Sequence, residues 1–66
     1  MRTYFGILKE GVLLEDAKKE LLRLRLRFVN YFSAIRIVQF ESVEQVKEPI
    51  KVFTSFEEER NDFGIE

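Results

Sequence analysis

The sequence predicts an α+β fold in which one amphipathic helix packs on a three-stranded, mostly antiparallel sheet, forming two layers. Three short segments concentrate β-branched and aromatic residues, and one longer segment repeats apolar residues at helical spacing. Hydrophobic residues make up 45% of the 66-residue chain, more than a disordered segment would contain. The elements follow in the order β-α-β-β, and we expect residues 1–66 to form a single domain.

The first strand and the helix are predicted from local composition and spacing. Thr3–Lys9 is rich in β-forming residues and is followed by a charged, glycine-containing stop. Gly6 inside this strand indicates a bulge or a close approach of another backbone segment. The helix is predicted over Leu13–Val29, where one apolar stripe contains Leu14, Ala17, Leu21, Leu24 and Phe28.

A rival interpretation applies to the end of this helix. Residues 22–28 alternate between apolar side chains and arginine, which is the period-two pattern of a strand. Leucine and arginine favour helix, so the longer helix is the preferred interpretation. In the alternative, the helix ends near Leu22, a strand follows, and the fold is a small ferredoxin-like βαββαβ domain.

Two later strands are predicted at Ala34–Phe40 and Ile50–Phe56, from their β-branched and aromatic residues. Between them, Ser42 and Gln45 have the spacing of a capping box. This spacing predicts one or two helical turns before the last strand, and the alternative is a plain loop. Residues 57–66 are predicted to be an acidic C-terminal segment that frays.

Composition and charge limit how such a chain is stabilised. It contains no Cys and no His, which excludes disulfides and a structural zinc site. Packing and self-association remain as sources of stability for a domain of this size. The net charge is −1, but residues 1–36 carry +4 and residues 37–66 carry −5. This split predicts two oppositely charged surfaces, unless folding interleaves the charges.

The chain is expected to be cytoplasmic and to make no contact with a membrane. The absence of Cys fits a reducing compartment. Met1–Gly11 contains no long apolar core of the kind that a signal peptide needs. No apolar run approaches the roughly 20 residues of a membrane-spanning helix.

The sheet face that the helix leaves open is the candidate interaction site. Alternation along the strands assigns seven apolar residues to the covered face: Phe5, Ile7, Ile35, Ile37, Ile50, Val52 and Phe56. The open face is then expected to carry aromatic and aliphatic residues with two cations: Tyr4, Leu8, Arg36, Val38, Phe40, Lys51 and Phe53. Aromatic residues beside arginine are typical of interface hot spots, and a monomer rarely exposes such a patch.

Two functions follow from this predicted face. The first is a non-catalytic protein-interaction module, acting as a homodimer or as an accessory or inhibitory regulatory protein. The alternative is single-stranded nucleic-acid binding, in which Tyr4, Phe40 and Phe53 stack on bases while Arg36 and Lys51 contact phosphate. The net charge of −1 disfavours the alternative, because nucleic-acid-binding domains are usually basic.

The sequence contains no recognisable catalytic or metal-binding set, and we predict no enzyme activity and no cofactor. The three serines have no histidine to activate them. The C-terminal acids lack the glycine-containing loop of a calcium site, and are predicted instead to protect the end of a strand: Glu57, Glu58, Glu59, Asp62 and Glu66. The arginines of the alternating stretch are predicted to form a solvated basic flank: Arg23, Arg25 and Arg27.

Overall fold

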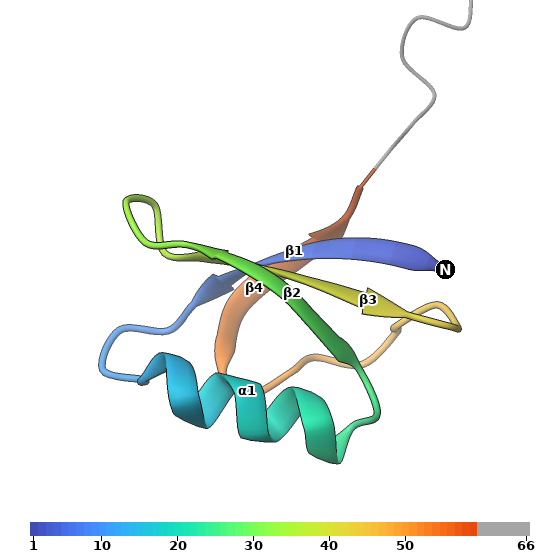
Figure 1. Cartoon of the computed structure of the whole chain (residues 1–66), viewed down its shortest axis with the longest axis horizontal. Helices are drawn as coiled ribbons and strands as arrows, with labels where there is room; N and C mark the ends of the chain where they lie inside the picture. The colour runs from blue at the N-terminus through green and yellow to red at the C-terminus, as the bar shows by residue number, and fades with distance from the viewer. Residues whose placement is uncertain (60–66) are drawn as a thin grey trace, which may run out of the picture.

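A computed structural model describes residues 1–59 of the chain and confirms the α+β class (Figure 1). The sheet has four strands instead of the three predicted, and all neighbouring strands are antiparallel. One helix covers one side of the sheet. The elements in chain order are β1 (Arg2–Leu8), α1 (Leu14–Arg23), β2 (Arg27–Phe32), β3 (Ile37–Ser42) and β4 (Phe53–Glu58).

The strand order is β2-β3-β1-β4. Because β1 and β2 are both antiparallel to β3, they run parallel to each other with β3 between them. With α1 as the connection, these elements form a split βαβ unit, which is also part of the ferredoxin-like arrangement. The second helix of that alternative is not formed in the described part of the chain, where residues 43–52 make bends and turns instead.

A Schellman motif ends α1 at Arg23. The amide of Leu26 donates to the carbonyl of Leu21 at 2.8 Å, and the amide of Arg25 donates to the carbonyl of Leu22 at 3.0 Å. These two bonds require a left-handed residue just beyond the helix. Arg25 supplies it, with φ of 63°.

The strand β2 begins directly after this motif, at Arg27, so the prediction of a helix as far as Val29 is wrong. The rival interpretation, a helix ending near Leu22 and followed by a strand, describes this region better. Part of the alternating stretch is helical and part is extended, because the motif divides it at Arg25.

The core lies between α1 and the facing side of the sheet. Three rings form a stacked column, in which the centroids of Tyr4, Phe40 and Phe53 are 5.4 Å apart at each step. Phe56 packs edge-on against Tyr4 and Phe40. The buried apolar residues come from the sheet, the helix and the loop before β4: Tyr4, Leu8, Ala17, Leu21, Val38, Phe40, Ile50, Val52 and Phe53.

Gly6 allows the ring of Phe53 to lie directly against β1. A Cβ atom built on Gly6 would lie 2.8 Å from Cδ2 of Phe53, which is closer than carbon atoms normally approach. The prediction of a close approach at this glycine therefore holds only in part, because the approaching group is a side chain instead of a backbone segment. The contact between Gly6 and the Phe53 ring determines which face of β1 points toward the core.

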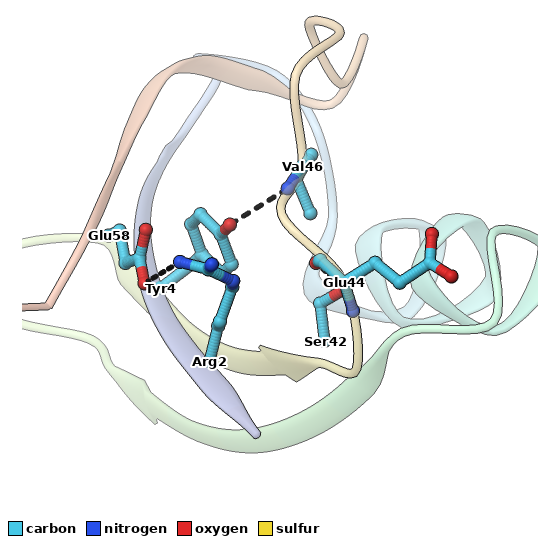
Figure 2. A network of polar contacts seen from close by, with 6 residues as sticks. All are labelled: Arg2, Tyr4, Ser42, Glu44, Val46 and Glu58. Carbon is cyan, nitrogen blue, oxygen red and sulfur yellow. Dashed lines mark hydrogen bonds and ion pairs between the residues drawn. The ribbon is translucent and has the colours of Figure 1, made fainter.

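The segment between β3 and β4 is held to the sheet by polar contacts instead of helical turns (Figure 2). The amide of Val46 donates to the Tyr4 hydroxyl at 2.8 Å. The Ser42 hydroxyl contacts both the amide and the carbonyl of Glu44. The capping-box prediction is wrong because the Ser42 side chain stabilises a local turn instead of a helix.

The last strand also starts later than predicted. Ile50 and Val52 are buried, but they belong to the loop, and β4 begins at Phe53. Glu57 and Glu58, predicted to lie in a frayed segment, are the last two residues of β4. Glu59 follows the strand, and residues 60–66 of that segment lie outside the described residues.

Candidate protein-interaction surface

The seven residues predicted to form an interaction face do not lie together on the surface. Five of them are core residues with at most 3% of their surface exposed: Tyr4, Leu8, Val38, Phe40 and Phe53. Arg36 is exposed in the β2–β3 turn, where its guanidinium donates to the carbonyl of Lys9 at 2.7 Å. Lys51 is exposed in the turn before β4. The predicted open face is therefore wrong, because the helix covers the opposite side of the sheet.

Both faces of β1 carry apolar side chains, so the alternation of residues along the strand does not determine which face packs against the helix. Two contacts determine that the face with Tyr4, Gly6 and Leu8 points toward the helix. Gly6 leaves room for Phe53 on the helix side, and the buried ring of Tyr4 can point inward because its hydroxyl bonds to Val46. A buried hydroxyl without such a partner would be costly.

The face away from α1 carries a contiguous apolar cluster across three strands. Ile37 of β3 lies opposite Phe32 of β2 on one side and Ile7 of β1 on the other. Phe5 is the next residue along β1 on this face. Ile7 is 44% exposed and Phe32 is 38% exposed, while Phe5 and Ile37 are half-buried. We call Phe5, Ile7, Phe32 and Ile37 the outer patch.

No element of the described chain covers the outer patch, since α1 lies on the other side of the sheet (Figure 1). The β2–β3 turn extends its apolar surface, because Ile35 in that turn is 61% exposed. The prediction that Phe5, Ile7 and Ile37 lie under the helix is therefore wrong, and Phe32 belongs to a strand that the preferred interpretation does not include. Predicting that these residues share the outer face would require the pairing of residues across β2, β3 and β1. That pairing can be worked out only if β2 is first recognised as a strand.

Polar residues border the outer patch along the strands. Phe5 lies between Gln39 of β3 and Glu57 of β4. Farther along the same face, Arg27 and Glu41 are paired across strands, with 3.8 Å between their charged groups. An apolar centre with a polar border is the usual anatomy of a protein interface.

The three arginines of the alternating stretch are distributed over three different elements: Arg23 in α1, Arg25 in the following turn and Arg27 in β2. Two of them contact carboxylates, since Arg23 hydrogen-bonds to Glu20 and Arg27 pairs with Glu41. The hydrogen bonds from Arg23 lower the pKa of Glu20 and raise the pKa of Arg23 itself. These contacts fit the predicted solvated flank better than a phosphate site.

A shallow groove lies between the end of α1 and the β3–β4 loop. Its volume is about 440 Å³, and its apolar lining comes from Leu24, Leu26, Val46 and Ile50. Charged residues of the loop form much of the remaining lining. Within residues 1–59, neither this groove nor any other region gathers three or more potential metal ligands from His, Cys, Asp and Glu.

Comparison of the chain with protein-family models, with curated proteins and with solved structures finds no match. No helix in the described part of the chain is both long and apolar enough to cross a membrane. The outer patch is a contiguous apolar cluster on the uncovered side of the sheet. The function is therefore inferred from this surface.

Proposed function

We propose that the chain is a small non-catalytic protein-interaction module that binds through the outer patch. Its partner is either a second copy or a larger protein, to which the chain serves as an accessory or inhibitory subunit. The observation that carries the proposal is the row Phe32, Ile37 and Ile7, aligned across three strands on the uncovered face. Contiguous apolar surface of this kind commonly marks a binding site.

Covering the patch would also stabilise a chain of this size. Ile7 and Phe32 each leave about two fifths of their surface exposed, and full burial of such a side chain contributes about 1.5–3 kcal/mol. Covering the remaining exposure therefore contributes about 1 kcal/mol for each of them. That is substantial for a chain of this length, whose total stability is expected to be only about 3–10 kcal/mol.

The nucleic-acid alternative loses the residues on which it depended. Tyr4, Phe40 and Phe53 are stacked in the core and have no free ring face for a base. The uncovered face instead carries the carboxylates of Glu41 and Glu57 near its aromatic residues. These carboxylates disfavour phosphate, so protein binding is the better-supported function.

The test replaces one residue of the patch and one matched residue elsewhere. Ile7→Lys introduces a charge within the outer patch, and Leu22→Lys introduces the same charge on α1, where Leu22 is 77% exposed. Circular dichroism checks that both variants fold. Sedimentation velocity over a range of concentrations then measures self-association, and affinity capture from the native cell measures binding to other proteins.

The expected result is that the wild type and Leu22→Lys associate with a copy or retain the same partner, while folded Ile7→Lys does neither. A wild type that stays monomeric at the highest concentration excludes the homodimer. A monomeric wild type that also retains no Ile7-dependent partner contradicts the proposed function.

A further inference from the structure

The two edges of the sheet differ in whether their backbone can bind another strand. At the β2 edge, Tyr31 lies opposite Val38. The amide of Leu8 donates to the carbonyl of Arg36 at 2.9 Å, and this sets the alternation of hydrogen bonds between β1 and β3, so that the backbone groups of Val38 bond to β1. The Tyr31 amide therefore points away from the sheet. The side-chain oxygen of Asn30 accepts this amide proton at 2.8 Å. The β2 ladder is also interrupted by a bulge between Phe28 and Asn30. A bulge and an occupied edge amide are devices that protect an edge strand.

β4 also contains a bulge, at Thr54, but it lies before the stretch Ser55–Glu58. Among the described residues, no side chain accepts an amide proton of this stretch in the way that Asn30 accepts that of Tyr31. The amide of Glu59 donates to the carbonyl of Thr3 at 2.7 Å, which sets the alternation of hydrogen bonds between β1 and β4. The amides and carbonyls of Phe56 and Glu58 therefore point outward. No contact in residues 1–59 occupies these outward groups. Such a row of free groups is a template for strand addition.

The charge of β4 selects the chemistry of the added strand. Glu57 is exposed on the outer face, and Glu59 is exposed just beyond the strand. Glu58 already binds a guanidinium, since Arg2 donates to its carboxylate at 2.7 Å (Figure 2). A second strand with lysine or arginine at alternate positions would place its cations beside the two exposed carboxylates.

A second copy of β4 is a poorer match for this edge. Antiparallel pairing of two copies about Phe56 would make the two Glu57 side chains diagonal neighbours, about 7–8 Å apart. Like charges at that distance repel each other, whereas a basic strand gains attraction at the same position. The charge complementarity therefore favours a foreign basic segment over self-pairing.

We propose that the free edge of β4 binds an extended segment rich in lysine or arginine from a partner protein, as an added sheet strand. This site is separate from the outer patch, because it uses backbone groups at the edge and not side chains of the uncovered face. The occupied Tyr31 amide disfavours strand addition at β2, and it therefore also disfavours the joining of β2 to β4 between copies in an open-ended sheet.

The test uses amide hydrogen exchange, measured by NMR on the full chain. The probes are two capped heptapeptides, one alternating lysine and valine and the other alternating glutamate and valine. Glu58→Pro removes an outward amide and is compatible with the edge conformation. Glu58→Gln is its matched control, because it also removes the carboxylate charge that pairs with Arg2 but keeps the amide. Each measurement is repeated at low and high salt.

At saturation, the lysine peptide should slow exchange of the Phe56 and Glu58 amides about tenfold, and the effect should weaken with salt. Glu58→Gln should keep protection at Phe56, and Glu58→Pro should abolish it. If exchange of these amides slows when the protein is concentrated without any peptide, the edge binds a second copy, and the proposal is overturned. Equal protection by both peptides, or no protection at Phe56, would also overturn it, without affecting the prediction for Ile7→Lys.

Discussion

At the scale of single residues, Gly6 connects the sequence to the choice of sheet face. Its missing side chain is the space that the Phe53 ring occupies. Adding a methyl group by Gly6→Ala should destabilise the protein by about 1–3 kcal/mol, because the ring must move within a packed core. Urea denaturation of wild type and variant measures this loss.

A double-mutant cycle separates this clash from other effects of the substitution. Phe53→Leu removes the ring plane that the new methyl group would meet, so Gly6→Ala should cost less in that background. If the two substitutions are additive, Phe53 is not the neighbour that makes glycine necessary at position 6.

Glu20 predicts a dependence of stability on pH. The hydrogen bonds from Arg23 lower the pKa of its carboxyl from the ordinary value of 4.5. A lowered pKa in the folded state stabilises the protein above the ordinary value, and this contribution disappears as the pH falls through the lowered pKa. Glu20→Gln should therefore reduce stability more at about pH 7 than at about pH 3. Urea unfolding at both values tests this, and an equal loss at both would contradict it.

At the scale of elements, the end of α1 depends on a residue type that is unusual there. Arg25 adopts φ of 63° at the position where a Schellman motif most often has glycine. Arg25→Gly should stabilise the protein by about 0.5–1 kcal/mol, because glycine adopts this conformation without steric cost. Lys19→Gly, in the exposed middle of α1, should destabilise it by about 1 kcal/mol. Thermal or urea denaturation measures the change in stability for both variants. Destabilisation by Arg25→Gly would show that Arg25 is not strained at this position.

The sequence predicted the elements with strong local signals and missed those that depend on a single backbone conformation. The strand at Thr3–Lys9 and the start of the helix were predicted to within about two residues. The strand β2 was not the preferred interpretation, because leucine and arginine favour helix and nothing in the residue type of Arg25 signals a left-handed conformation. The Ser42 spacing was misleading because its hydroxyl is used within a turn.

At the scale of the whole molecule, the prediction interchanged the inner and outer faces of the sheet, because β2 was not the preferred interpretation. Burial alternates from Thr3 to the end of β1 and along all of β3, so a shift of one residue reverses every side chain. Without β2 as a fourth strand, both phases offered a plausible apolar face. The contacts that decide the phase join Gly6 to Phe53 and Tyr4 to Val46, and both are distant in the sequence.

The uneven distribution of charge along the sequence becomes a difference between the two sheet edges. The order β2-β3-β1-β4 places Arg27 at one edge and Glu57 and Glu58 at the other. Folding separates these groups, while the Arg2–Glu58 and Arg27–Glu41 pairs join opposite charges across neighbouring strands. The resulting asymmetry underlies the proposed preference of β4 for a basic strand.

The assignment of the two sheet faces is tested most directly by a pair of adjacent substitutions in β3. Val38 is fully buried, and Ile37 is half-buried on the outer patch. Val38→Lys places an unpaired charge in the core and should unfold a protein of this size, at a cost above about 4 kcal/mol. Ile37→Lys should change the free energy of unfolding by less than about 1 kcal/mol, because the lysine can extend into water. If urea denaturation shows the opposite order, with Ile37→Lys unfolded and Val38→Lys stable, the outer patch is not the exposed face.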